Sequence, residues 1–325
     1  MTEPVIEVQE LKRHFLSRTG ALSTKRRVIE ALKGVSFQVF KGELFGYLGP
    51  NGAGKTTTVK ILTTLLAPSS GTAKVLGLDV FSQARAIRRR INFVFGGERG
   101  LYFRLSGWDN LRYFADLYFV PPAVQKRRIP FLLELVGLST RAQDKVETYS
   151  RGMCQRLHIA RGLINDPEVL FLDEPTIGLD PVAAFELRQV IKGVVKEGKT
   201  VFLTTHYMKE AEELCDRIAI INDGQIVALD TPSNLKQYAR LVPVIEFAVE
   251  GMSERHLAKI RAIPEVQAAT LDDVGMSQVL KVQSSRGSEL IQPLMALLPD
   301  VRFGGVKVRE PTLEDAYIQL VGGKA

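Results

Sequence analysis

The sequence predicts an α/β protein followed by a small α+β domain, on the basis of three observations. From Val5 to about Leu235, short apolar runs alternate with longer stretches of helical periodicity, as in a sheet covered by helices. One apolar run leads through a glycine-rich loop into a helix, and after Thr231-Pro232 short alternating strands dominate. The 325 residues are 45% hydrophobic and 24% charged, which suits two domains and excludes a disordered or low-complexity protein.

The first domain is expected over residues 1–237, with its chemistry on the loops that join strands to helices. A buried strand at 43–48 is followed by the glycine-rich segment 49–54 and by a helix from about Lys55 to Leu66. This helix is expected to carry three apolar side chains on one face: Val59, Leu62 and Leu66.

The next segment, from Arg85 to about Leu138, is rich in aromatic residues and in helical periodicity. It predicts a helical insertion over about 85–165. Two buried core strands and a hairpin that turns at Asn222-Asp223-Gly224 are expected after it, at 169–172, 200–205, 218–221 and 225–229.

Residues 240–325 are expected to form the small α+β domain, with a ferredoxin-like arrangement as the preferred interpretation. Ile245, Phe247 and Val249 alternate with polar or small neighbours and predict its first strand. The elements expected after it are a helix capped by Ser253, strands at 266–271 and 279–282, a helix at 288–298, a strand at 301–308 and a helix capped by Thr312.

Composition limits where the protein acts. No apolar run approaches the roughly 18 to 20 residues that cross a bilayer, and the segment Met1 to Glu10 is acidic without an apolar core, so neither secretion nor membrane spanning is expected. Cys154 and Cys215 are the only cysteines, too few for a disulfide scaffold, and they favour a reducing compartment. The sequence therefore predicts a cytoplasmic protein.

Basic residues outnumber acidic ones by 43 to 36, and three short clusters carry the excess: Lys25-Arg26-Arg27, Arg88-Arg89-Arg90 and Lys126-Arg127-Arg128. Such clusters suit contact with nucleic acid or anionic lipid, but short basic runs are more often solvated helix faces. The charge alone does not decide between these interpretations.

A phosphate-binding loop is the first chemical motif. Gly49-Pro50-Asn51-Gly52-Ala53-Gly54-Lys55-Thr56 fits the pattern G-x-x-x-x-G-K-[ST], and the following Thr57 is included in the predicted nucleotide site. The glycines let backbone N–H groups turn toward phosphate oxygens, Lys55 adds a charge near the β and γ phosphates, and Thr56 offers its hydroxyl to Mg²⁺. The alternative, a glycine-rich turn, is disfavoured by the strand before it and the helix after it.

Two acidic residues end a buried strand, and a histidine ends another. Asp173 is predicted to hold the Mg²⁺ shell through water, and Glu174 to polarise the water that attacks the γ-phosphate. His206, after Thr204-Thr205, is predicted to reach the γ-phosphate and orient that water. A solvated acidic turn is the alternative for the carboxylates, and the phosphate loop disfavours it. For His206 the alternative is a structural hydrogen-bonding histidine, which stays open.

A further motif precedes the acidic strand. Tyr149-Ser150-Arg151-Gly152-Met153, followed by Gln155-Arg156, resembles the signature motif of ATP-binding-cassette (ABC) ATPases. Gly178-Leu179-Asp180 resembles the D-loop of that family, and His206 matches its switch histidine. The motifs occur in the order of the family within residues 5–235.

This resemblance implies a P-loop NTPase cassette that binds ATP and Mg²⁺ in a head-to-tail dimer, between the phosphate loop of one copy and the signature motif of the other. Ser150 and the Gly152 backbone, at a helix N-terminus, would donate to the γ-phosphate across the interface, and Asp180 is assigned to the same nucleotide site. Phe15 matches the aromatic position that stacks on adenine in the family, with a plain core residue as the alternative.

The sequence departs from the family pattern in two places. Arg151 and Met153 stand where the signature usually has glycine and glutamine, and the role of Arg151 is left open. The position of the usual Q-loop glutamine falls on Gly97, which puts the usual Mg²⁺ contact of that glutamine in doubt; Glu98 or a water is the possible replacement. Gly97 therefore marks the loop without being a ligand.

The tail resembles a narrower group. Residues 240–325, which end Val306-Lys-Val-Arg-Glu-Pro-Thr-Leu-Glu-Asp-Ala-Tyr317, are similar to the C-terminal extension of ATPases of the type-2 ABC exporter group, the daunorubicin-resistance-like subfamily. The resemblance implies an ATPase subunit at the cytoplasmic face of the cell membrane, a homodimer bound to a separate integral membrane subunit. The segment from Gly97 to Arg128 would transmit motion to that subunit.

Two other functions stay open at this stage. A soluble ABC ATPase that acts on nucleic acid or ribosomes would use the basic clusters as its binding surface, although such proteins usually carry two cassettes or a long coiled coil. An importer ATPase with a regulatory tail is the second alternative. The cargo, the direction of transport and the function of the C-terminal domain are not specified by the sequence, because specificity in this arrangement lies mainly in the membrane subunit.

Overall fold

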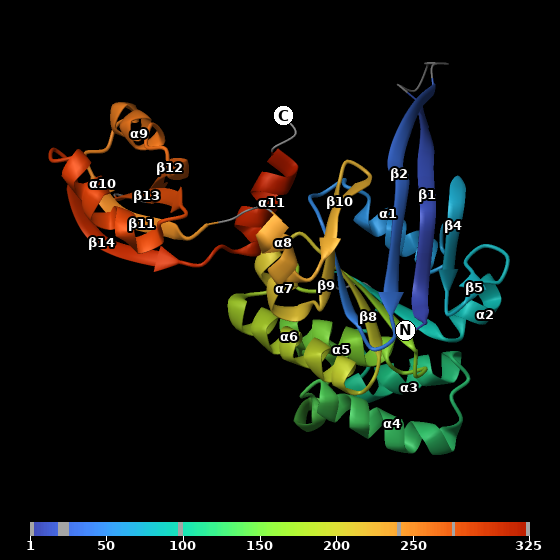
Figure 1. Cartoon of the computed structure of the whole chain (residues 1–325). Helices are drawn as coiled ribbons and strands as arrows, with labels where there is room; N and C mark the ends of the chain where they lie inside the picture. The colour runs from blue at the N-terminus through green and yellow to red at the C-terminus, as the bar shows by residue number, and fades with distance from the viewer. Residues whose placement is uncertain (1–2, 19–25, 97–99, 239–241, 275–276, 323–325) are drawn as a thin grey trace. The chain divides into compact units, whose positions relative to one another are not determined.

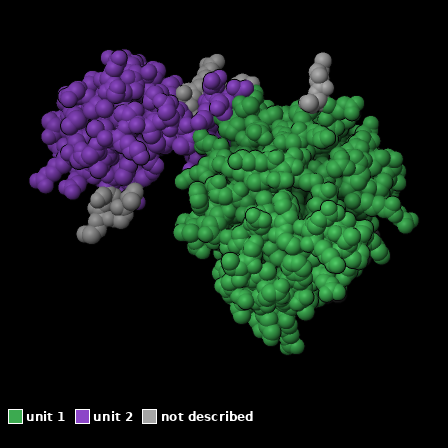
Figure 2. Space-filling view, turned by 90° about the horizontal axis from the view of Figure 1, so that it is seen from below, with its two compact units in different colours: residues 1–232 green, residues 233–325 purple. Residues whose placement is uncertain are grey.

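The computed structural model describes most of the chain, as residues 3–18, 26–96, 100–238, 242–274 and 277–322. The chain forms two compact units, Met1–Pro232 and Ser233–Ala325, which Figure 2 colours separately. Among the described residues the first unit has two sheets and the second has one, and each unit has a hydrophobic core of its own. Among the helices formed by the described residues, none has the length and apolar character to cross a membrane.

A mostly parallel six-stranded sheet forms the centre of the first unit (Figure 1). Its strands are β3 (Leu44–Leu48), β6 (Ile91–Phe95), β7 (Val169–Asp173), β8 (Thr200–Thr205), β9 (Arg217–Asn222) and β10 (Gln225–Asp230). They follow the order β10-β9-β3-β8-β7-β6, with only β10 antiparallel to its neighbour. β3 and β7 are buried along their whole length, which is why they were recognisable as continuous apolar runs.

A second, antiparallel sheet completes the core of this unit. It contains β1 (Pro4–Arg18), β2 (Arg26–Phe40), β4 (Ser70–Val75) and β5 (Leu78–Asp79), in the order β2-β1-β4-β5. β1 and β2 are much longer than the short strands expected, because several register shifts interrupt the apolar alternation that would have revealed their length. Aromatic rings from both sheets pack with centroids 5.5 to 6.0 Å apart: Phe37, Phe45, Tyr47 and Phe202.

Helix α1 (Lys55–Leu62) begins at the predicted residue but ends before Leu66. Thr64 has a φ of 64°, in the left-handed region, and this conformation stops the helix. Leu62 is buried in the core as predicted, whereas Leu66 packs against the core only partly. The shorter helix keeps its N-terminus at the phosphate loop.

The predicted helical insertion at 85–165 is wrong at its N-terminal end. The region contains α2 (Ala84–Arg88), α3 (Gly107–Leu117), α4 (Pro122–Leu135), η1 (Ser139–Arg141), η2 (Val146–Thr148) and α5 (Arg151–Gly162), but it also contains strand β6. β6 pairs in parallel with β7 and belongs to the central sheet. A run of five residues, four of them apolar, is too short for its periodicity to distinguish a strand from a helix, so tertiary pairing decides the outcome.

Two helices and a hairpin end the first unit. α6 (Pro181–Lys196) follows β7, and α7 (Met208–Leu214) follows β8. The hairpin of β9 and β10 is confirmed, and it turns at Asp223 and Gly224, whose φ angles of 45° and 74° fit the two-residue turn preferred between twisted strands.

The second unit contains α8 (Pro232–Tyr238), β11 (Val244–Glu250), α9 (Glu254–Arg261), β12 (Val266–Val274), β13 (Ser277–Ser284), η3 (Gly287–Leu290), α10 (Ile291–Leu297), β14 (Arg302–Arg309) and α11 (Leu313–Gly322). Its antiparallel sheet has the order β12-β13-β11-β14, and the elements from β11 to β14 follow the β-α-β-β-α-β succession of ferredoxin-like folds. Ser253 and His256 form a capping box at α9.

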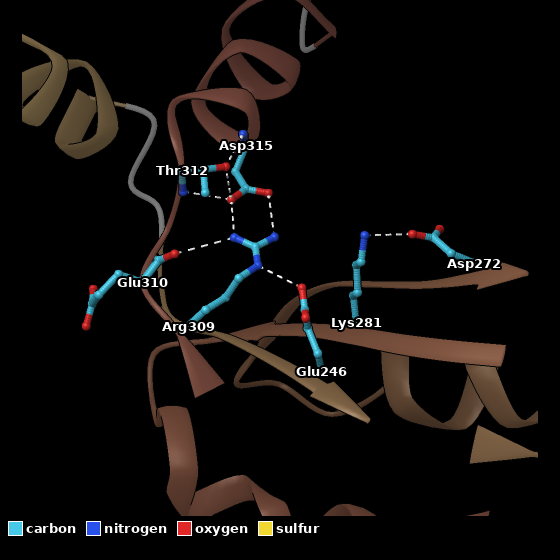
Figure 3. Close-up of polar contacts among 7 residues, drawn as sticks. All are labelled: Glu246, Asp272, Lys281, Arg309, Glu310, Thr312 and Asp315. Atoms are coloured by element: carbon cyan, nitrogen blue, oxygen red, sulfur yellow. Dashed lines mark hydrogen bonds and ion pairs between the residues drawn. The ribbon is translucent and has the colours of Figure 1, made fainter. Parts of the chain in front are cut away.

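Arg309, at the end of β14, joins the sheet of the second unit to α11 (Figure 3). Its Nε donates to Glu246 Oε1 at 2.7 Å, and its terminal nitrogens donate to the Asp315 carboxylate at 2.7 and 3.2 Å. The Thr312 backbone N–H donates to the same carboxylate at 2.8 Å. Burial raises the pKa of Asp315, but the hydrogen bonds from Arg309 and Thr312 outweigh this effect and lower that pKa below its ordinary value.

Arg309→Ala is expected to destabilise the second unit by about 2 kcal/mol, because two largely buried carboxylates lose a charged donor. Amide hydrogen exchange of the 325-residue chain should then become faster in β14 and α11 and stay unchanged in α1. Since folding lowers the pKa of Asp315, this stabilisation is present above about pH 4 and is lost as the pH falls further. Arg302→Ala, an exposed arginine on the same strand, is the control, and equal exchange in both variants would contradict the prediction.

Candidate active site

The predicted phosphate loop connects β3 to α1. Gly54 caps α1 with a φ of 110°, and a Cβ at this position would lie 2.6 Å from a backbone carbonyl oxygen, so only glycine fits. Lys55 is 5% exposed, and its Nζ donates to the carbonyl oxygens of Gly49 at 2.8 Å and Pro50 at 3.1 Å. The other predicted nucleotide contacts lie in the same loop or in the first turn of α1: Asn51, Gly52, Ala53, Thr56 and Thr57.

Asp173, the last residue of β7, is brought against the phosphate loop. Thr56 Oγ1 donates to Asp173 Oδ2 at 2.9 Å, and the Thr204 hydroxyl donates to the other carboxylate oxygen. The two residues predicted to hold a metal are therefore in direct contact. The carboxyl ends of parallel strands meet at one edge of the sheet, which explains how residues 117 positions apart come together.

Glu174 follows Asp173 and lies in a strained backbone conformation, with a φ of 51°. Its backbone N–H donates to the Thr204 carbonyl at 3.0 Å, which fixes the turn. Its Oε1 lies 3.1 Å from Lys55 Nζ and 3.3 Å from His206 Nδ1. The carboxylate thus faces both the lysine of the phosphate loop and the histidine after β8.

His206 is the third residue of this group. It directly follows β8, and its ring packs against that of Tyr207 with centroids 4.1 Å apart. Although Nδ1 is close to Glu174, it forms no hydrogen bond of normal geometry with any residue in the described ranges. The imidazole therefore keeps its hydrogen-bonding capacity for a further group at the site.

Phe15 lies in β1, opposite Ile29 of β2, and its ring is 37% exposed. The Arg13 guanidinium stacks over the ring, with its central carbon 4.7 Å from the ring centroid, and donates to the Ala67 carbonyl at 2.9 Å. The interpretation of Phe15 as a fully buried core residue does not fit this exposure. An exposed ring held in place by a cation is suited to stacking on an aromatic base.

Ser150 and Asp180 both cap helices. The Ser150 hydroxyl accepts from the Met153 N–H at the start of α5, and Asp180 Oδ1 accepts from two N–H groups at the start of α6. Gly152 lies where the two helices approach, because a Cβ there would be 2.7 Å from the Ala183 Cβ. All of these contacts are within α5, within α6 or between these two helices. Contact of Ser150 or Gly152 with a nucleotide bound to a second copy of the chain therefore remains a prediction.

Thr204 was not recognised as a site residue from the sequence. Its hydroxyl donates to Asp173, and its carbonyl accepts from the Glu174 N–H. The feature of the sequence that could have indicated this role is its position two residues before His206. Gly97 and Glu98, the proposed Q-loop positions, lie outside the described residues. Arg151 is the exposed first residue of α5, and its role stays open.

Comparison with known proteins identifies the family of the chain. Residues 32–177 match the protein-family model for the ABC transporter family. The linearmycin resistance ATP-binding protein LnrL of Bacillus subtilis (strain 168) is 34% identical over 293 residues, which cover 90% of this chain and 93% of that protein. The daunorubicin resistance ATP-binding protein DrrA3 of Streptomyces coeruleorubidus is 35% identical over 302 residues, which cover 90% of this chain and 92% of that protein. Both matches extend well beyond the first unit.

The fold is also that of solved cassettes. The dimeric structure of MJ0796, a bacterial ABC transporter cassette, superposes with a TM-score of 0.60 at 26% identity, over 70% of this chain and 98% of that chain. The predicted ABC fold and ATPase activity are confirmed by these comparisons, whereas the roles of individual site residues remain predictions. The chain belongs to the ABC transporter family, in which it is an ATP-hydrolysing, ATP-binding subunit similar to those of drug-resistance exporters.

Proposed function

We propose that two copies of this chain bind MgATP between them, head to tail, and that its hydrolysis powers export through a separate membrane subunit. One observation carries the proposal: the Glu174 carboxylate lies within 3.3 Å of both Lys55 and His206, beside a phosphate loop. In this proposal Glu174 is the general base, Lys55 the cation and His206 the imidazole near the γ-phosphate of a bound nucleotide, and their closeness supports it.

Thr56 and Asp173 fit a magnesium ion. Hydroxyl and carboxylate oxygens are the donors that Mg²⁺ prefers, and here they already lie 2.9 Å apart. When bound, Mg²⁺ neutralises charge on the nucleotide phosphates. Thr204 holds the Asp173 carboxylate from its other side and so fixes its orientation.

Glu174 is proposed to accept a proton from the attacking water. Lys55 contacts Glu174 in this structure, and phosphate oxygens of ATP would compete for the same ammonium group. Nucleotide binding would thus free one oxygen of Glu174 for the water, while His206 Nδ1 lies 3.3 Å from the carboxylate. The strained turn at Glu174 is held by the hydrogen bond of its N–H to the Thr204 carbonyl.

The second half of the site is proposed to come from another copy. The N-terminus of α5 presents Ser150 and the Gly152 backbone, and a twelve-residue helix carries the positive end of a dipole there. Asp180 caps the adjacent α6 and would lie near the same interface. The similarity to MJ0796, which was solved as a dimer, supports pairing of two copies.

The membrane subunit is proposed to contact the helical region between β6 and β7. Large apolar side chains are exposed there: Tyr102, Phe103, Leu105, Tyr113, Leu117, Tyr118, Phe119, Val124 and Phe131. Large apolar side chains exposed in one region of a protein are typical of a protein-binding surface. The names of the relatives, which refer to drug resistance, support export as the process and a location at the cytoplasmic face of the membrane.

Phe119→Asp tests this surface. Phe119 is 91% exposed, so a charge there costs little folding energy but would oppose burial against a partner. The variant is expected to lose most of its co-sedimentation with membranes of a cell that also makes the membrane subunit. Phe81→Asp, at a phenylalanine 72% exposed between β5 and α2, is the control and should sediment as the unchanged chain does. Equal recovery of both variants with membranes would contradict the proposed surface.

A further inference from the structure

The hairpin of β9 and β10 packs against the phosphate loop, although neither strand carries a predicted site residue. Ile221, in β9, lies directly against Gly49, where a Cβ would be 2.2 Å from the Ile221 carbonyl oxygen. Near the other end of the loop, Ala53 is 3% exposed, and its carbonyl accepts from the Gly224 N–H at 3.1 Å. The hairpin therefore contacts the loop at both of its ends.

The hydrogen bond from Gly224 fixes the orientation of one peptide group of the loop. A trans peptide is planar, so its C=O and N–H bonds point in opposite directions. Because the Ala53 carbonyl points toward the hairpin, the N–H of Gly54, which belongs to the same peptide group, points away from it. Phosphate-binding loops hold their ligand with backbone N–H groups of this kind. One bond from the hairpin thus sets the direction of a candidate phosphate donor.

The turn of the hairpin is itself held by β2. The Gly224 carbonyl accepts from the Lys33 N–H at 2.9 Å, and the Lys33 ammonium pairs with the Asp223 carboxylate. A Cβ at Gly224 would lie 2.9 Å from the Ala31 carbonyl oxygen, and a Cβ at Gly54 would lie 2.6 Å from the same oxygen. The turn, the loop and β2 therefore meet at one point that leaves no space for a side chain.

The contact with the loop is not a requirement of the hairpin. Asn222 pairs with Gln225, so the two residues between them lie outside the ladder, and their positive φ angles already satisfy the turn. The ladder makes no use of the Gly224 N–H, which donates to the phosphate loop instead.

We propose that the turn at Asp223 and Gly224 positions the phosphate loop, and that its bond to Ala53 directs the N–H of Gly54 to a phosphate oxygen of the nucleotide. The proposal rests on the proposed function, because it requires that this loop hold the phosphates. Gly224 is a positioning residue, since it acts through Ala53. A misdirected N–H removes a donor that the nucleotide uses before and during hydrolysis, so affinity should fall while kcat at saturating ATP stays nearly unchanged.

Gly224→Ala is the first test. Because its Cβ would lie 2.9 Å from the Ala31 oxygen, the turn has to move away from β2, and the bond to Ala53 lengthens. The dissociation constant for a fluorescent ATP analogue is expected to rise about tenfold, with kcat at saturating ATP within about twofold of that of the unchanged chain.

Gly77→Ala is the matched control. Gly77 lies between β4 and β5 with a φ of 75°, close to the 74° of Gly224, so alanine is equally strained there. A Cβ at Gly77 meets no other atom of the described residues within 4 Å. This variant should bind the analogue as the unchanged chain does. Equal affinities in the two variants overturn the inference, and so does a Gly224→Ala variant whose kcat falls as much as its affinity.

Amide hydrogen exchange of the unchanged chain decides the question if Gly224→Ala does not fold. Nucleotide binding should immobilise the loop and slow exchange of the Gly224 N–H by about fivefold or more relative to the Gly77 N–H. An unchanged ratio overturns the inference.

Lys55→Ala separates this inference from the proposed function. If the unchanged chain binds no ATP analogue, or if Lys55→Ala binds it equally well, the proposed function and the inference fail together. If Lys55→Ala loses affinity while Gly224→Ala does not, the inference alone fails.

Discussion

Glu174→Gln is expected to reduce ATP hydrolysis at least about 100-fold while leaving ATP binding intact, because general-base catalysis contributes about 10² to 10⁴ in rate. The amide has nearly the same shape as the carboxylate, but it does not accept a proton from water at neutral pH. With hydrolysis blocked, ATP remains in the site, and two copies should stay joined. Phosphate release and sedimentation with saturating MgATP measure the two effects.

Binding of the nucleotide by this variant should even improve slightly, since Lys55 loses the carboxylate at 3.1 Å and becomes fully available to phosphate. Glu168→Gln is a suitable control, because that glutamate forms an exposed ion pair with Arg90 in the same domain. If the variant hydrolysed ATP at the original rate, Glu174 would not be the general base. A variant that stays monomeric when saturated with nucleotide, with no companion protein able to restore pairing, would contradict the dimer.

The central residues of the site were predictable because each belongs to a short local pattern. The phosphate loop needs glycines at fixed offsets, and the pair Asp173 and Glu174 ends a run of buried residues that only an interior strand would have. Their three-dimensional proximity then follows from the fold class, since parallel strands end at the same edge of a sheet. For these residues, the local sequence and the sheet topology both predict that they lie close together.

Other features depend on contacts that no local pattern records. Glu210 stands in the run Lys209-Glu-Ala-Glu-Glu213, which looks like an exposed helix face, yet it is buried while Glu213 is exposed. Strand β6 was hidden in a range of helical character because five residues carry too little periodicity. The interaction of Arg13 with Phe15 depends on side-chain packing on one strand. In each case the packing of the folded chain decides, and the local sequence does not record that packing.

Lys55→Ala is expected to have the opposite effect from Glu174→Gln, with weakened binding as the primary loss. A charged hydrogen bond contributes about 1.5 to 3 kcal/mol, so the affinity for ATP should fall roughly 10-fold to 100-fold, as measured by titration with a fluorescent analogue. The Gly49 and Pro50 carbonyls also lose their donor, which loosens the loop and adds to the effect. Lys60→Ala, at an exposed lysine in the last turn of α1, is the control and should bind normally.

The double variant Lys55→Ala, Glu174→Gln separates the two roles. If nucleotide is what joins the two copies, this variant should remain monomeric at ATP concentrations that pair the single Glu174→Gln variant, and pairing should return only at roughly 10-fold to 100-fold higher ATP. The shift follows from mass action, because the dimer forms only from chains that have bound nucleotide. Pairing at the same ATP concentration in both variants would show that Lys55 does not hold the phosphates, even if hydrolysis is lost in each.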